Sequence, residues 1–201
     1  VALGVREGDI EIVENGVDPV PQEVPTLPDD YRVHLVTLSR LVPHKRIEEA
    51  IDAVAQIDGA VLDVVGSGWW EDELREYAAP YGDMVVFHGH VSEPYKHALL
   101  ERAAGHLLPS RKEGWGIAVI EVAQHGVPTV AYASAGGVAD SIRDGETGRL
   151  VYPGEDFGEA VGETVGRREA MAPAARAWAA RFSWEATGRK FAQVIAAVLS
   201  S

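Results

Sequence analysis

The sequence has 201 residues and is 46% hydrophobic, which is enough to bury the core of one sizeable domain. Eighteen Lys and Arg against 31 Asp and Glu leave a formal charge of −13, so most of the surface would repel nucleic acid. The chain has no cysteine, which excludes a disulfide framework, a thiolate metal site and redox chemistry on sulfur. No apolar run approaches the roughly 20 residues that a membrane-spanning helix needs, and we therefore expect a cytoplasmic protein.

Short β-branched apolar runs alternate with stretches of helical periodicity from Val33 onward, which is the pattern of a parallel sheet covered by helices. The predicted strands are residues 33–38, 60–65, 84–88, 105–109, 128–132 and 149–152. The helices predicted between them are residues 46–57, 71–79, 94–104, 116–125 and 137–144. This order predicts an α/β, doubly wound, Rossmann-like domain over residues 33–181, with any ligand beyond the carboxyl ends of the strands.

Two further segments flank the predicted sheet. Residues 19–30 carry four prolines and are expected to be an extended linker, within a junction of residues 1–32 that follows a preceding domain. Residues 155–181 and 185–199 are predicted to be two Ala-rich helices, with Ser183 as N-cap of the second.

A glycine-bracketed turn, residues 113–116, precedes the predicted helix that begins near Ile117. Glycine lets the backbone approach a ligand, and the N–H groups of Ile117 and Ala118 have no partner within the first helical turn, so this end can bind an anion. Glu113 lies before the helix and Glu121 about one turn inside it, so both carboxylates can flank one ligand and accept hydrogen bonds from sugar hydroxyls. Isolated glutamates at this spacing would be ordinary solvated charges, but the turn and helix favour a binding site.

Two other turns follow predicted strands. Arg40 and Lys45 lie after the first strand, where a diphosphate could bind between a guanidinium fork and an ammonium. Cations near a helix start oppose the helix dipole, so their presence there favours a functional role. Gly66-Ser67-Gly68 follows the second strand but lacks the third glycine of a dinucleotide fingerprint, and alone it is weak evidence.

Together these segments resemble the retaining glycosyltransferases of the GT-B fold, the group that includes bacterial mannosyltransferases and is related to glycogen synthases. The resemblance covers nearly the whole chain in order, and the spacing of Glu113 and Glu121 is its most specific element. The matching segments are VENGVD (13–18), SRLVPHKRIEEAIDA (39–53), VVGSG (64–68), VVFHGHVS (85–92), LLPSRKEGWGIAVIEVAQHGVPTVAY (107–132) and GGVADSIRDGETGRLV (136–151).

The resemblance implies a role for each matched position. Arg40 and Lys45 would hold the donor diphosphate and stabilise it as leaving group, helped by the backbone amides of Gly116, Ile117 and Ala118. Glu121 would bind the ribose hydroxyls, and Glu113 would contact the transferred sugar. Gly66 would line the phosphate pocket, and His90 would lie near the nucleotide base.

The family has two Rossmann-like domains, of which only the second is recognisable here. The resemblance therefore implies an absent N-terminal domain that binds the acceptor, carries any membrane association and receives the helix of residues 182–201. The isolated domain is then expected to be inactive.

The sequence also lacks motifs that would indicate metal-dependent sugar transfer or hydrolysis. It contains no Asp-x-Asp, the arrangement of metal-dependent sugar transferases of the other common fold, so we expect no metal and no cofactor, only a nucleoside diphosphate sugar as substrate. Positive charge must then come from the cations and the helix dipole. His88 and His90 could share a strand face, but without a third ligand a structural or solvent-facing role is favoured. The absence of a Gly-x-Ser-x-Gly elbow argues against a hydrolase.

The function expected from the whole pattern is transfer of a hexosyl group from a nucleoside diphosphate sugar to an acceptor, with retention of anomeric configuration. Two alternatives stay open at this point. One is a nucleotide-sugar epimerase of the same architecture, and the other is a non-catalytic nucleotide-sugar-binding domain.

Overall fold

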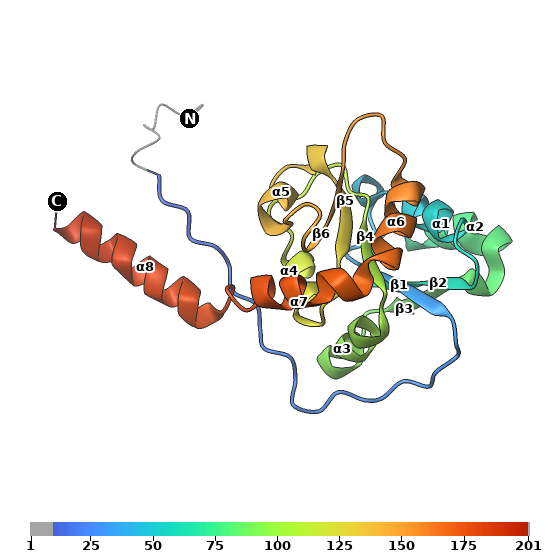
Figure 1. The fold of residues 1–201 in the computed structure, drawn as a ribbon, viewed down its shortest axis with the longest axis horizontal. Helices are drawn as coiled ribbons and strands as arrows, with labels where there is room; N and C mark the ends of the chain where they lie inside the picture. The colour runs from blue at the N-terminus through green and yellow to red at the C-terminus, as the bar shows by residue number, and fades with distance from the viewer. Residues whose placement is uncertain (1–9, 201) are drawn as a thin grey trace.

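The structure is a computed structural model that describes residues 10–200. Within this range six strands form one parallel sheet in the order β3-β2-β1-β4-β5-β6 (Figure 1). The strands are β1 (Val33–Leu38), β2 (Ala60–Val65), β3 (Val85–Gly89), β4 (Gly105–Leu108), β5 (Thr129–Tyr132) and β6 (Gly148–Val151). The predicted doubly wound α/β sheet is confirmed, with each strand end within one residue of its expected place.

Helices cover both faces of the sheet because successive strand residues point to opposite sides. In β1, Leu35 packs into a core with α1, α2 and α6, whereas Val36 packs into a second core with α3 and α4. A further helix, α7, lies against α4. The helices of these two layers are α1 (Ile47–Val54), α2 (Glu71–Ala78), α3 (Glu93–Arg102), α4 (Ile117–Gln124), α6 (Phe157–Gly166) and α7 (Arg168–Ala179).

The strand order reverses between β1 and β4. Chains that leave these two neighbouring strands turn toward opposite faces of the sheet, so a crevice opens at their carboxyl ends. The turn after β1 and the turn after β4, which carry the predicted site residues, therefore meet at this point.

Three helix predictions need correction. The single helix expected over residues 155–181 is wrong, because Arg167 adopts φ −107° and ψ 5° and separates α6 from α7, which then pack on different partners, α1 and α4. The helix expected over residues 137–144 is limited to α5 (Val138–Ser141), since the Arg143 amide donates to the Thr147 hydroxyl and Asp144 accepts from Leu150, forming a local turn. The helix expected from residue 46 begins at Ile47, after a 3₁₀ turn, η2 (Pro43–Lys45).

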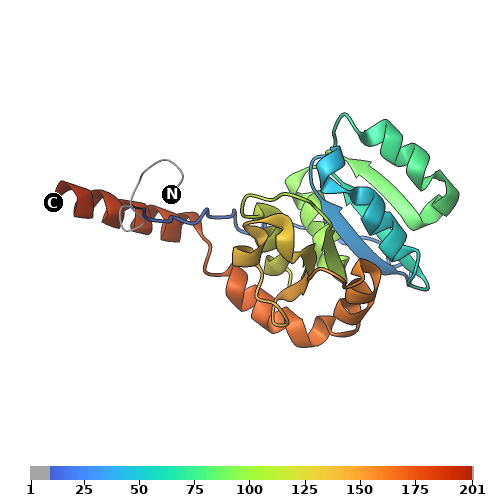
Figure 2. The same cartoon turned by 90° about the horizontal axis from the view of Figure 1, so that it is seen from above.

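The last helix, α8 (Trp184–Leu199), extends away from the body of the domain beside the N-terminal segment (Figures 1 and 2). None of its described side chains is buried. The predicted N-cap is confirmed, because the amide of Ala186 donates to Ser183 Oγ at 3.2 Å. Residues 19–30 contain neither helix nor strand, as expected for a linker.

Residues 14–18 and the start of α8 are joined side by side. The Val17 amide donates to the carbonyl of Phe182 at 3.0 Å, and the Trp184 indole donates to Asp18 at 2.9 Å. Lys190 pairs with Glu14 at 2.9 Å. Helix α8 is thus fastened to the N-terminal segment rather than to the sheet. No helix within residues 10–200 is both long and apolar enough to cross a bilayer.

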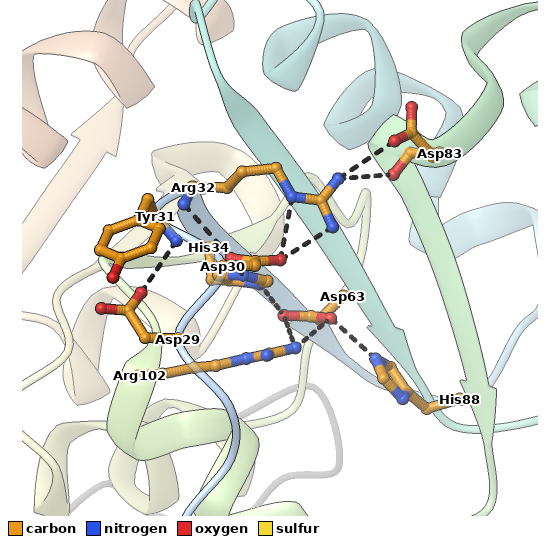
Figure 3. Close-up of polar contacts among 9 residues, drawn as sticks. All are labelled: Asp29, Asp30, Tyr31, Arg32, His34, Asp63, Asp83, His88 and Arg102. Atoms are coloured by element: carbon orange, nitrogen blue, oxygen red, sulfur yellow. Dashed lines mark hydrogen bonds and ion pairs between the residues drawn. The ribbon is translucent and has the colours of Figure 1, made fainter.

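A buried carboxylate, Asp63 of β2, holds the other end of the linker to the sheet (Figure 3). His34 and His88 each approach it to 2.7 Å, Arg102 approaches it to 3.0 Å, and His34 also contacts Asp30 at 2.9 Å. Burial raises the pKa of Asp63, but the hydrogen bonds from the histidines and the Arg102 charge outweigh burial, and the net shift is downward. The structural role expected for His88 is confirmed by this contact.

Candidate functional site

The turns after β1 and β4 are joined by a backbone bond and an ion pair. The amide of Arg111 donates to the carbonyl of His44 at 2.9 Å. The ammonium of Lys45 lies 2.6 Å from Oε1 of Glu113, and these side chains are only 15% and 10% exposed. Two residues far apart in the sequence, both predicted to belong to the site, are therefore in direct contact.

A cavity of about 300 Å³ opens beside this ion pair. Its lining includes five of the predicted site residues: Lys45, Glu113, Gly116, Ile117 and Ala118. The remaining lining residues are Asn15, Leu38, Ser39, Leu108 and Trp115.

The start of α4 forms one wall of the cavity. Gly116 precedes the helix with φ 87°, a conformation that glycine adopts without strain, and no described side chain caps the helix. The first amides of α4 therefore remain available, and the positive end of the helix dipole lies at the cavity. The Lys45 ammonium, paired with Glu113, lies at the same cavity, so positive groups are available there for an anion despite the acidic surface.

The position of Glu113 is set by its backbone. Its amide donates to the carbonyl of Ala135 at 2.6 Å, and its carbonyl accepts from Gly137 at 3.3 Å. A Cβ on Gly137 would overlap the carbonyl oxygen of Gly114. Only glycine at this position lets the loop after β5 support the turn that carries Glu113.

Gly66 has a similar packing role beside the turn after β1. It has φ 128°, and a Cβ there would overlap the carbonyl oxygen of Ser39, which lines the cavity. Arg40 follows Ser39 directly, and its side chain is exposed. Gly66 and Arg40 thus border the site without lining the cavity.

Glu121 and His90 lie outside the cavity lining. His90 is exposed and follows Gly89, whose φ of 66° ends β3. Glu121 projects from α4 toward α3, where its Oε1 lies 2.8 Å from the ammonium of Lys96. The same ammonium lies 2.6 Å from Glu93.

Lys96 was missed by the sequence prediction, as were the cavity residues Asn15 and Trp115. The one available signal for Lys96 was its spacing of three from Glu93, which favours an ion pair along a helix. Burial lowers the pKa of Lys96, but the hydrogen bonds to Glu121 and Glu93 outweigh burial and raise it. Lys96 is therefore a charged residue held between two carboxylates.

No group of three or more His, Cys, Asp or Glu side chains in the described part of the chain is arranged to hold a metal ion. Among the residues predicted for the site, the cationic side chains are those of Lys45 and Arg40.

The glycosyl transferases group 1 family matches residues 23–178. The chain belongs to this family. A GDP-mannose-dependent alpha-(1-6)-phosphatidylinositol monomannoside mannosyltransferase of Mycobacterium tuberculosis is 33% identical, over 92% of this chain and 55% of the relative.

Solved structures agree with this assignment. The Anabaena protein HepE, in complex with UDP, superposes with a TM-score of 0.73 at 25% identity, over 83% of this chain and 49% of HepE. The lipopolysaccharide outer core galactosyltransferase WaaB shares the fold with a TM-score of 0.78 at 22% identity, over 98% of this chain and 58% of WaaB. The chain thus spans about half the length of these proteins and corresponds to one Rossmann-like domain of a GT-B glycosyltransferase.

Proposed function

We propose that this chain is the donor-binding half of a glycosyltransferase that moves a hexosyl group from a nucleoside diphosphate sugar to an acceptor with retention of configuration. The observation that carries the proposal is the contact between Lys45 and Glu113 at a cavity walled by the uncapped start of α4. In this arrangement the cation and the free amides can bind a diphosphate, while the carboxylate can bind a sugar.

In this proposal the positive groups stabilise the departing diphosphate. Negative charge grows on the leaving oxygen as the bond to the sugar breaks, and the Lys45 ammonium with the amides at the start of α4 is already oriented to receive it. Arg40, exposed on the adjoining turn, adds a guanidinium that can bind the diphosphate in bidentate fashion. Removing one such preorganised donor typically costs about a hundredfold to a thousandfold in turnover.

In this proposal Glu113 has one role before the donor binds and another after it binds. Without ligand it neutralises Lys45 at 2.6 Å. When the diphosphate takes over the ammonium, the carboxylate is released to accept hydrogen bonds from the hydroxyls of the transferred sugar. The ion pair therefore keeps both groups in place in the empty site.

We further propose that donor binding needs no divalent ion, because the cations and the helix dipole supply the compensating charge. Isothermal titration calorimetry with UDP and with GDP, in buffer containing a chelator, tests this directly. We expect at least one of the two nucleotides to bind, and Lys45→Met to weaken that binding by at least tenfold. Binding that appears only after magnesium or manganese is added would contradict the metal-free mechanism.

A further inference from the structure

Lys96 carries a charged side chain at a buried position. It occupies a buried stretch of α3, is only 8% exposed, and is followed by the buried residues His97, Ala98, Leu99 and Leu100. Lysine is rarely buried unless it is paired, because desolvation of the ammonium and loss of side-chain freedom both oppose burial. Burial of Lys96 between α3 and α4 therefore needs an ion-pair partner that compensates for the desolvation of its ammonium.

Glu93 alone does not provide this compensation. Glu93 lies three residues earlier on the same helix, its side chain is 65% exposed, and its pair with Lys96 is an ordinary helix-surface contact. The second pair crosses from α3 to α4, and there Glu121 is only 23% exposed. The crossing contact is the one that fixes a group of the candidate site.

The contact fixes one oxygen of Glu121 and leaves the other free. Lys96 donates to Oε1 at 2.8 Å, and no described residue donates to Oε2. Oε2 is not a buried atom without a partner, so it is accessible to solvent. The carboxylate is thereby held in one orientation with an accessible acceptor oxygen. A group held this way loses little freedom when a ligand binds, which strengthens the interaction.

The position of Glu121 on α4 matches the length of a nucleotide. Ile117 lies at the cavity and Glu121 four residues later, so the two lie on one helix face about 6 Å apart along the axis. A diphosphate at the start of the helix places the ribose of the same molecule about one turn further along.

We propose that Lys96 is a positioning residue that presets Glu121 to accept the ribose hydroxyls, so that the site selects ribonucleoside diphosphates over their 2′-deoxy forms. This inference rests on the proposed function, since it needs a nucleoside diphosphate at the start of α4. Lys96 acts only through Glu121, by orienting the carboxylate and balancing its charge.

The test compares UDP and GDP with their 2′-deoxy analogues by calorimetry on the whole 201-residue chain. A hydrogen bond to a charged group contributes about 1.5–3 kcal/mol, so the wild-type protein should bind the ribonucleotide about tenfold to a hundredfold more tightly. Lys96→Met should reduce this preference to less than about threefold. Lys96→Arg keeps the charge and should retain a preference closer to that of the wild type.

A matched control is Lys190→Met, which removes another lysine–glutamate pair at 2.9 Å, and neither Lys190 nor its partner Glu14 lines the cavity of the candidate site. It should leave the ribose preference unchanged. Circular dichroism verifies folding, and if Lys96→Met does not fold, Lys96→Gln replaces it with the same expected direction.

The ratio of affinities is the deciding quantity, because a general loss of stability or positive field lowers both affinities together. A preserved ratio in the folded Lys96 variant overturns the proposal, as does an equal collapse in Lys190→Met. A wild-type ratio near one shows that Glu121 does not bind the ribose, and it overturns this inference while leaving diphosphate binding intact. Failure of the wild-type chain to bind either nucleotide overturns the proposed function itself.

Discussion

The ion pair between Lys45 and Glu113 makes a ligand compete with the protein for one ammonium. A diphosphate must draw Lys45 away from a carboxylate 2.6 Å distant before it gains the full interaction. Under the proposed function we therefore expect the two glutamates to affect nucleotide binding in opposite directions, although the sequence alone predicts that both are ligand-binding carboxylates.

Substitution of each glutamate should separate these roles. Glu113→Gln should bind free UDP or GDP a few-fold more tightly, because Lys45 is no longer neutralised, while turnover of the assembled enzyme falls as contacts to the sugar are lost. Glu121→Ala should bind the same nucleotide about tenfold more weakly, since a charged acceptor is removed. Calorimetry on both variants measures this, and equal losses of affinity would contradict the assignment.

Gly66 should not tolerate a side chain. Gly66→Ala places a Cβ against the Ser39 carbonyl oxygen and forces φ 128°, so we expect a loss of about 2–4 kcal/mol in the free energy of unfolding. Gly162→Ala is the control, because it lies in α6 with open space around it and should be neutral or stabilising by up to about 1 kcal/mol. Urea unfolding of both variants measures the two free energies. An unchanged free energy of unfolding in Gly66→Ala would show that the turn can move aside.

At the scale of elements, the strands were predictable because a strand buried on both faces is mostly apolar, and β2 is buried at all six positions and apolar at five of them, Asp63 being the exception. The break at Arg167 was not, because an Ala-rich sequence satisfies helix periodicity throughout and only packing on α1 and α4 separates the two helices. The turn of residues 113–116 was predictable from its glycines, whereas Asn15 enters the cavity from a segment nearly a hundred residues away in sequence.

Helix α8 contributes little to the stability of the sheet. Its apolar residues Phe191, Ile195, Val198 and Leu199 are 46–83% exposed, and its described contacts reach residues 14–18 instead. Limited proteolysis should therefore cleave within residues 184–200 first, and removal of residues 188–201 should change the free energy of unfolding by less than about 0.5 kcal/mol. A loss above about 2 kcal/mol would mean that α8 packs on the domain in solution.

At the scale of the whole molecule, the buried His106 and the half-buried His125 link folding to pH. Burial lowers the pKa of His106 to about 3 and that of His125 to about 4, and neighbouring cations act in the same direction. The Nε2 atom of His106 is buried without a hydrogen-bond partner among the described residues. Both rings are therefore neutral in the folded protein at neutral pH.

Stability should fall as the pH drops below the unfolded histidine pKa of about 6.5. Between that value and the folded pKa values the unfolded chain binds more protons, and each histidine contributes up to about 1.4 kcal/mol per pH unit. Urea unfolding at pH 7.5, 6 and 5 measures the slope, which His106→Leu should reduce without abolishing it, because burial also lowers the pKa of His97 and of His125. His44→Gln, at an exposed position, should leave it unchanged; an equal slope in all three proteins would exclude His106 as the cause.

The chain spans 55% of the Mycobacterium tuberculosis relative, and α8 presents an uncovered apolar stripe beside the N-terminal segment. A contiguous exposed apolar stripe can mark a site of association. Closure of a cleft between two domains is what places an acceptor at the donor and excludes water. We therefore expect the 201 residues alone to bind a nucleoside diphosphate sugar without transferring its hexose. Proton NMR of the anomeric signals of UDP-glucose and GDP-mannose, with phosphatidylinositol monomannoside as acceptor, measures turnover, and the full-length mycobacterial relative with GDP-mannose and the same acceptor is the positive control. Sustained transfer by the isolated chain at a rate comparable to that control would overturn the half-enzyme proposal, whereas an intact donor together with calorimetric binding supports it.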